Sequence, residues 1–316
     1  MKKIKMTKNN DMTFAQGYDK FIYEHCILNN LREGTIRHYN EIITYSWYKY
    51  YDKESLLSEL SQDDINSYVI WLRGNNTKDT TINIYLKAIK TIIRYFRAKE
   101  WVDDKLVVNL IKTNSEPING YSDREIELLI KKPNLSKCGF VEYRNWMIIN
   151  FLCGTGCRRS TLINIHIEDI NLVNNTVYYR HTKNRKCYSI SITKYLADIL
   201  GEYINYLPSE CDYLFPTILG EQMRVRSLTH TIDDYNTKRG VSTGIHKFRH
   251  WFAKKSIMNG MDLITLQRIL GHSSLDMVKR YVNLLTGDTA INEINYNPLE
   301  SMIRKSSRID MKSHKR

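Results

Sequence analysis

The sequence predicts a mainly α-helical protein with a small β-sheet, built from an N-terminal helical domain and a second, α+β domain. Three observations lead to this prediction. Helical hydrophobic patterns separated by short polar turns fill the first third, with no convincing strand before residue 115. A polar stretch containing Pro117 and Gly120 follows. Beyond it, residues 176–192 (TVYYRHTKNRKCYSISI) alternate as the two strands of a hairpin do.

The N-terminal helices are predicted from polar capping residues that precede periodic apolar segments. We expect helices over about residues 13–29, 35–49, 61–73 and 80–99. Their N-caps would be Thr13, Thr35, Ser61, and either Thr80 or Thr81.

The fourth of these helices separates its charged and apolar residues onto two faces. The apolar face would pack into a helical bundle and consists of Tyr85, Ile89, Ile92, Ile93 and Phe96. The charged residues follow 3-4-3 spacing and form one basic stripe, Lys87, Lys90, Arg94 and Arg97. Such a stripe suits a phosphate backbone, although a solvated surface would give the same pattern.

The second domain is expected to begin with a capping box formed by Ser122 and Glu125. The hairpin would turn at His181–Lys186, and mostly helical segments follow from Lys194. We therefore expect a basic tail over 1–12, the helical domain over 13–114, a linker over 115–121, the second domain over 122–288, and a C-terminal segment over 289–316.

Composition favours a globular protein with a polyanionic partner. The 316 residues are 42% hydrophobic, which is enough for two cores, and carry a formal net charge of +13. Much of this excess lies in the terminal tails, which weakens net charge as an argument for nucleic acid. No apolar run approaches the ~20 residues that span a bilayer, and no signal peptide is recognisable. Six scattered cysteines suggest reduced thiols in the cytoplasm.

Three segments of the second domain carry residues suited to phosphate chemistry. GTGCRRSTL places Arg158 after a glycine turn, and IHKFRHWFAKK places His246 and Arg249 on one helical face. LGHSSLDMVKRY, residues 270–281, supplies His272 and Tyr281. Lys183 would lie in the hairpin turn. No acidic cluster accompanies these residues to hold Mg²⁺, so no metal is expected.

This set of side chains suits attack by a tyrosine on a phosphodiester. The Tyr281 hydroxyl has a free pKa of about 10, so it needs a base or a positive field, and a histidine can act as the base. Two guanidiniums can bind the non-bridging oxygens as negative charge develops. A lysine at the hairpin tip could protonate the departing 5′ oxygen. Each residue alone has a simpler explanation as packing, loop charge or a surface pair, and Lys183 shares its turn with Arg185 and Lys186.

Taken together and in this order, the segments resemble the motifs of the tyrosine recombinase (phage integrase) family, of its simple two-domain type. TGCRRSTLINIHIEDI resembles the first arginine box, TKNRKCYSISI the lysine hairpin, IHKFRHWFA the His-x-x-Arg box, and LGHSSLDMVKRY the His-to-Tyr box. The agreement extends over about residues 120–285. Residues 13–114 resemble the family's SAM-like core-binding domain more loosely.

The resemblance implies a site-specific DNA recombinase that works through a 3′-phosphotyrosyl intermediate without metal, ATP or another cofactor. Tyr281 would be the nucleophile, Arg158 and Arg249 would bind the scissile phosphate, and Lys183 would be the general acid. His246 and His272 would assist proton transfer and hydrogen bonding.

The resemblance also implies partners. These are double-stranded DNA held in a clamp that the basic stripe faces, and a homotetramer on paired sites. An accessory DNA-bending or directionality protein is a further candidate partner. Residues after about 289 would dock on a neighbouring protomer. The site of action would be the bacterial cytoplasm, at the nucleoid, with no membrane partner.

One position departs from the family pattern, because Thr161 stands where an acid is common three residues after the first arginine. The short N-terminal extension is expected to leave no room for an arm-site DNA-binding domain. A mobile-element integrase, a transposase and a chromosome-dimer resolvase therefore all remain open. Competing interpretations are a DNA-binding accessory factor with a decayed catalytic centre, and a basic RNA-binding protein. All six candidate catalytic positions hold competent residues, and aromatic RNA-stacking motifs are not recognisable in the sequence.

Overall fold

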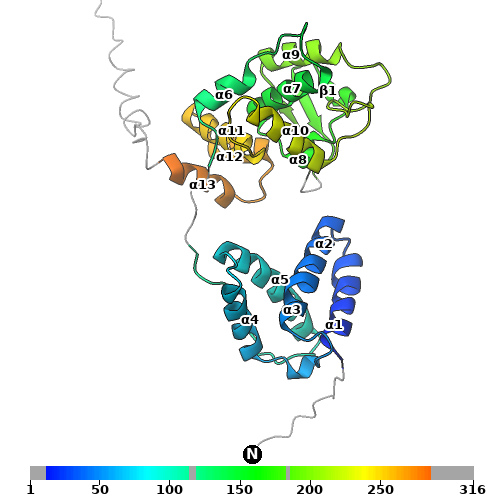
Figure 1. Cartoon of the computed structure of the whole chain (residues 1–316), viewed down its shortest axis with the longest axis vertical. Helices are drawn as coiled ribbons and strands as arrows, with labels where there is room; N and C mark the ends of the chain where they lie inside the picture. Colours follow the sequence, from blue (N-terminus) through cyan, green and yellow to red (C-terminus); the bar gives the residue numbers. More distant parts are fainter. Residues whose placement is uncertain (1–11, 114–118, 183–185, 286–316) are drawn as a thin grey trace, which may run out of the picture. The chain divides into compact units, whose positions relative to one another are not determined.

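The computed structural model describes residues 12–113, 119–182 and 186–285. The chain divides into two compact units, Met1–Glu116 and Pro117–Arg316 (Figure 1). The first unit is helical and the second joins helices to a three-stranded sheet, so the predicted fold class is confirmed. In the described ranges, no helix has the length and apolar character needed to cross a membrane.

The first unit begins with the predicted cap. Thr13 and Gln16 form a capping box at the start of α1 (Phe14–Lys20), which continues as the wider π-helical turns of η1 (Phe21–Ile27). The chain then forms the further elements α2 (Glu33–Ile42), η2 (Ile43–Trp47), α3 (Tyr48–Tyr50), η3 (Leu57–Glu59), α4 (Gln62–Gly74) and α5 (Asp79–Ala98). Ser61 caps α4, as predicted.

Two helix starts differ from the prediction. Helix α2 begins at Glu33 and not at Thr35, and α5 begins at Asp79 and not at Thr80 or Thr81. In each case an acid occupies the first turn, where the helix dipole favours negative charge. The carbonyls of Arg32 and Lys78 accept the first helical hydrogen bonds, and neither residue caps its helix through its side chain.

Aromatic side chains form the core of the first unit. Phe14 packs against Trp47 and Phe96, with ring centroids 5.5 Å apart in each pair. Trp47 meets Tyr68 edge to face at 4.8 Å. The apolar face predicted for α5 is buried in this core, except that Tyr85 is only partly buried. The face of α5 turned away from the core is therefore left for its charged residues.

The second unit is built around α7 (Phe140–Thr155), which is buried on most of its surface. The predicted capping box of Ser122 and Glu125 begins α6 (Asp123–Ile130). After α7 come α8 (Arg159–Leu162) and η4 (Ile167–Asp169). The sheet follows, with β1 (Ile170–Asn171), β2 (Thr176–Tyr179) and β3 (Tyr188–Ser191).

The sheet is antiparallel in the order β1-β2-β3. The β2–β3 hairpin confirms the predicted alternation, with Val177 opposite Ile190 and Tyr179 opposite Tyr188. The sequence did not reveal β1, whose two residues are too few to show a period of two. The helices that follow are α9 (Lys194–Ile204), α10 (Val225–Thr237), α11 (His246–Met258), α12 (Leu263–Leu270) and α13 (Asp276–Leu285).

A small second core holds the last three helices together. It consists of the buried residues Ala253, Leu266, Leu270, Val278 and Tyr281. This core fixes α13 against α11 and α12, and so brings Tyr281 near the residues that α11 carries.

Candidate active site

Arg158 lies where the chain leaves the central helix. Helix α7 ends at Gly156, whose φ of +60° is the left-handed conformation that glycine adopts at little cost. Arg158 then becomes the N-terminal flanking residue of α8. Its guanidinium donates to the carbonyl oxygen of Gly271 at 2.8 Å. This contact joins the first arginine segment to the loop that follows α12.

Arg249 joins three segments of the chain. It is 6% exposed, on α11, and donates to the carbonyl oxygens of Gly156 at 2.9 Å and Leu270 at 2.7 Å. A third contact, of 2.7 Å, reaches Nε2 of His272. Burial, followed by repulsion from Arg158, lowers the pKa of Arg249 to about 10, so the guanidinium stays charged at neutral pH.

The contact with Arg249 fixes the tautomer of His272. Arginine has no acceptor, so Nε2 of His272 must accept and the ring proton must lie on Nδ1. That buried Nδ1 has no hydrogen-bond partner among the described residues. Burial, then the two arginines, lower the pKa of His272 to about 4. At neutral pH the His272 ring is therefore neutral, and its Nδ1–H group can donate a hydrogen bond to a bound ligand.

Gly271 is required between these groups. Its φ is +58°, and an added Cβ would lie 2.7 Å from the Tyr188 hydroxyl and 3.3 Å from a guanidinium nitrogen of Arg158. The Tyr188 hydroxyl donates to the carbonyl oxygen of Ile269 at 3.2 Å. Tyr188, the first residue of β3 after the hairpin turn, thus joins the hairpin to the end of α12.

Tyr281 lies on α13 and is 4% exposed. Its hydroxyl oxygen is 3.0 Å from Nδ1 of His250. Burial raises the pKa of Tyr281, and the positive charges of Arg249 and Arg158 oppose that shift. The hydroxyl therefore lies within the electrostatic field of both arginines, as a tyrosine nucleophile requires.

Two predicted site residues remain, His246 and Lys183. His246 is exposed at the start of α11, and its ring centroid is 6.4 Å from that of His250. Lys183 lies outside the described residues. The described residues on the two sides of this turn are joined by a hydrogen bond, in which the Thr182 hydroxyl donates to the carbonyl oxygen of Lys186 at 2.7 Å.

In the described part of the chain, backbone groups and not a carboxylate orient the two arginines. Thr161 is buried, and no described carboxylate forms an ion pair with Arg158 or Arg249. Backbone carbonyls of Gly156, Leu270 and Gly271 take that role. The substitution of Thr for an acid therefore leaves both guanidiniums positioned and their positive charge uncompensated by the described part of the chain.

The basic stripe belongs to the first unit. Lys87, Lys90 and Arg94 are exposed on α5. Arg97 is half-buried, and its guanidinium donates to the carbonyl oxygen of Asp104 at 3.3 Å. Three of the four side chains are thus free of the core and available to a polyanion.

Two residues of the site were missed by the sequence prediction, His250 and Tyr188. His250 lies one helical turn after His246 and directly follows Arg249, so its position inside the His-x-x-Arg segment was a usable signal. Tyr188 gave no such signal, because its role depends on the hydrogen bond from its hydroxyl to Ile269 of α12.

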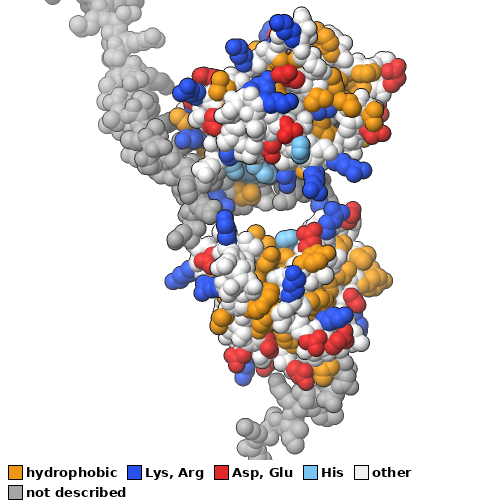
Figure 2. All heavy atoms as spheres, in the orientation of Figure 1, with side chains coloured by type: hydrophobic (Ala, Val, Ile, Leu, Met, Phe, Trp, Pro, Cys, Tyr) orange, Lys and Arg blue, Asp and Glu red, His pale blue; other side chains and the backbone are white. Residues whose placement is uncertain are grey.

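An open pocket of about 530 Å³ adjoins His272. The hairpin end lines one side with Thr182, Lys186, Cys187 and Tyr188, and the α12 end lines the other with Arg268 and Ser273 among others. On the face drawn in Figure 2, histidine and basic side chains gather along the lower edge of the second unit. The pocket is basic and solvent-accessible, as a site for a nucleotide strand needs to be.

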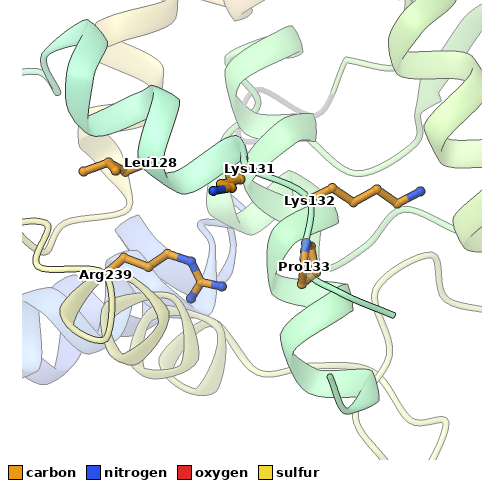
Figure 3. Close-up of a pocket in the computed structure, with 5 residues that line it drawn as sticks. All are labelled: Leu128, Lys131, Lys132, Pro133 and Arg239. Atoms are coloured by element: carbon orange, nitrogen blue, oxygen red, sulfur yellow. The ribbon is translucent and has the colours of Figure 1, made fainter. Parts of the chain in front are cut away.

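A second pocket, of about 370 Å³, contains none of the candidate residues. Lys131 and Lys132 follow α6 and Arg239 follows α10, and Figure 3 shows that the Lys132 side chain extends away from Arg239. Lys132 pairs with Glu202 and Arg239 with Glu142. These acids neutralise two of its three cations, so the pocket offers little attraction to a polyanion.

The comparisons with known proteins agree with this geometry. Residues 122–287 match the model of the phage integrase family, and residues 11–112 match that of the phage integrase SAM-like domain. The first match covers more than half of the chain, which therefore belongs to the phage integrase family. The activity of this chain is therefore site-specific DNA recombination.

Individual relatives are distant in sequence. The tyrosine recombinase XerC of Chlamydia caviae is 26% identical over 242 residues, which are 74% of this chain and 77% of that protein. The Tn1549 transposon integrase in complex with transposon right end DNA is 17% identical, with a TM-score of 0.72 over 92% of this chain and 100% of that one. A lambda integrase tetramer bound to a Holliday junction is 15% identical, with a TM-score of 0.67 over 86% and 78%. The two structures support the fold.

Proposed function

We propose that this recombinase cleaves DNA by attack of the Tyr281 hydroxyl on a backbone phosphorus, which forms a 3′-phosphotyrosyl ester and releases a 5′ hydroxyl. The observation that carries the proposal is the convergence of Arg158, Arg249 and His272 with Tyr281 from segments far apart in the sequence. No single local motif would produce this arrangement.

In the proposed mechanism the two arginines bind the non-bridging oxygens of the scissile phosphate. Their carbonyl partners hold the guanidiniums in place before the substrate arrives, so little reorganisation is needed in the transition state. The unpartnered Nδ1–H of His272 would donate to one of these oxygens once the site opens to the strand. His246, exposed at the helix start, would contact the same phosphate.

Lys183 would protonate the departing 5′ oxygen. Its hairpin ends beside the pocket that contains His272, where a strand bound in that pocket would pass. Because the phosphotyrosyl ester conserves the energy of the broken bond, the 5′ hydroxyl of another strand can attack it and rejoin the backbone.

We infer that the substrate is double-stranded DNA carrying a recombination site. The exposed cations of α5 would bind its phosphates, and the pocket beside His272 would receive the cut strand. Related integrases have been solved with transposon end DNA and as a tetramer on a Holliday junction. On that basis a tetramer on paired sites is proposed for this chain. An accessory DNA-bending or directionality protein is proposed as an additional partner on the family resemblance alone.

The test compares wild type with Tyr281→Phe, and with Tyr195→Phe as a matched control, because Tyr195 is 60% exposed on α9. Each protein is expressed with its native element, denatured and recovered, and any attached DNA is sequenced. We expect attached DNA with wild type and Tyr195→Phe and none with Tyr281→Phe, which should still bind DNA when native. Strand cleavage by Tyr281→Phe would refute the nucleophile. No attachment with any of the three would favour a DNA-binding accessory factor.

A further inference from the structure

His250 is the side chain that touches the nucleophile. Its Nδ1 lies 3.0 Å from the Tyr281 hydroxyl oxygen, and the two ring centroids are 5.8 Å apart. The small core of the last three helices holds α11 and α13 in this register, with Ala253 of α11 packed with Val278 of α13. The contact is therefore built into the packing of the unit.

The backbone around His250 is also held from its other side. A Cβ on Gly120 would lie 3.6 Å from the Cβ of His250 and 3.4 Å from the backbone nitrogen of Trp251, which is ordinary van der Waals distance, so the Gly120 backbone packs against α11 beside His250. The indole of Trp251 donates to Asp123 at 2.9 Å. These contacts hold the part of α11 that carries His250.

The charge state of His250 suits a proton acceptor. The titratable and charged groups that face it are His246 and Arg249 on its own helix, His272 after α12, and Tyr281 on α13. Burial first, and then repulsion from His246 and Arg249, lower the pKa of His250 below its ordinary value. The ring is neutral at pH 7, so one nitrogen carries a lone pair.

We propose that His250 is the general base that accepts the Tyr281 proton during strand cleavage. As the Tyr281 O–H bond breaks, the proton passes to Nδ1 of His250, and the phenolic oxygen forms its bond to phosphorus. The bond from phosphorus to the 5′ oxygen breaks, and that oxygen takes a proton from the general acid named under the proposed function. In rejoining, the imidazolium returns its proton to Tyr281 as the tyrosyl oxygen leaves. This inference rests on the proposed function.

The transfer is expected to accompany bond formation and not to precede it. Burial raises the pKa of Tyr281 while that of His250 is lowered, so the resting pair keeps the proton on the phenol. Bonding of the oxygen to phosphorus makes its proton acidic, and the imidazole is already within reach. General base catalysis of this kind typically contributes ~10²–10⁴-fold in rate.

The test separates proton acceptance from positioning. His250→Asn places an amide near the position of Nδ1, which can hold the hydroxyl but cannot take its proton. His250→Ala leaves a space that free imidazole can enter. His230→Asn is the matched control, since His230 is exposed on α10. Single-turnover formation of the covalent complex is measured on the DNA site recovered with wild type, together with native DNA binding and thermal melting.

We expect His250→Asn to form the covalent complex ~10²–10⁴-fold more slowly than wild type, with DNA affinity within about twofold. Added imidazole should accelerate His250→Ala at least about tenfold, and leave wild type and His230→Asn unchanged. If His250→Ala does not fold, fluorinated tyrosine at position 281 in the His250→Asn protein replaces it. The more acidic phenol should recover part of the lost rate.

A wild-type rate for His250→Asn would overturn the inference and leave His250 a positioning residue. So would a slow His250→Ala protein that folds, binds DNA and gains nothing from imidazole. In both cases the proposed function would stand. If wild type itself forms no covalent complex, the proposed function fails first, so the two failures can be told apart.

Discussion

Arg249 and His272 share a hydrogen bond of 2.7 Å between a guanidinium nitrogen and Nε2. The two residues come from α11 and from the loop after α12, and both are buried. The bond fixes the His272 tautomer and, with the carbonyls of Gly156 and Leu270, the orientation of the guanidinium. In the proposed mechanism one arginine therefore positions two phosphate-binding groups, its own guanidinium and the His272 ring.

Arg249→Lys is expected to reduce strand cleavage by ~10²–10³-fold, the effect typical of losing one preorganised donor to a developing oxyanion. Lysine keeps the charge but cannot span Gly156, Leu270 and His272 at once. Covalent complex formation and native DNA binding should be measured together. Arg159→Lys is the matched control, because Arg159 is exposed beside Arg158. Equal losses in the two variants would contradict the special role of Arg249.

The pKa of His272, lowered to about 4, predicts how acid affects the protein. In the unfolded chain the pKa of His272 is near 6.5. Between about pH 6.5 and 4, therefore, the unfolded state binds a proton at His272 and the folded state does not. Stability is thus full above that window and is lost as the pH falls through it. Thermal melting of wild type should fall more between pH 7 and 4.5 than that of His272→Gln.

The matched control for this prediction is His181→Gln, since His181 is exposed. It should follow the wild-type curve. In wild type, the NMR titration of the His272 ring should have its midpoint near pH 4. A midpoint close to the ordinary histidine value would mean that burial and the arginines do not act on the ring as the structure implies.

The sequence predicted the parts of this protein that depend on local chemistry. Thr13, Ser61 and Ser122 have side chains that cap a helix, and all three helix starts were predicted correctly. Arg32 and Lys78 flank their helices without a side-chain cap, so nearby threonines were chosen instead. The alternation of apolar and polar residues revealed the hairpin, but β1 was too short to show such a pattern.

The features of the site also divide into those that the sequence predicted and those that it did not. Arg158, His246, Arg249, His272 and Tyr281 lie in recognisable segments, and the structure joins four of them by hydrogen bonds or by their electrostatic fields. The contact of His250 with Tyr281 spans 31 positions and exists only because α13 packs on α11. The support of the arginines by carbonyls was equally hidden, since every residue offers the same backbone group.

Gly271→Ala is expected to destabilise the protein by more than the cost of a left-handed alanine. That cost is roughly 1–2 kcal/mol. At Gly271 the new Cβ also meets the Tyr188 hydroxyl at 2.7 Å. Gly240→Ala is the matched control, because Gly240 has φ +67° and no neighbouring atom within 4 Å. Chemical unfolding should give the larger loss for Gly271→Ala, together with slower cleavage that Gly240→Ala does not show.

Adding Tyr188→Phe to Gly271→Ala tests the cause. Removing the hydroxyl takes away the clashing atom, so the double variant should be more stable than the sum of the single changes predicts. Additive losses would show that the backbone conformation alone makes Gly271 necessary.

The basic stripe on α5 predicts a change in the salt dependence of DNA binding. Each phosphate contact contributes about 0.9 to the slope of log affinity against log salt concentration. Replacing Lys87, Lys90 and Arg94 by Gln should therefore lower that slope by about 2 to 3 if all three contact the backbone. Arg97→Gln should change the slope less, because Arg97 is half-buried and donates to Asp104.

The comparison that decides this prediction is a second triple variant with the same change of charge. Arg37, Lys49 and Lys53 are exposed elsewhere in the first unit, on or near α2 and α3. Replacing them by Gln should leave the slope nearly unchanged if the α5 stripe is the DNA-binding face. Similar slopes for the two triple variants would show that the first unit attracts DNA through its overall charge, and that the stripe is a solvated surface without a specific contact.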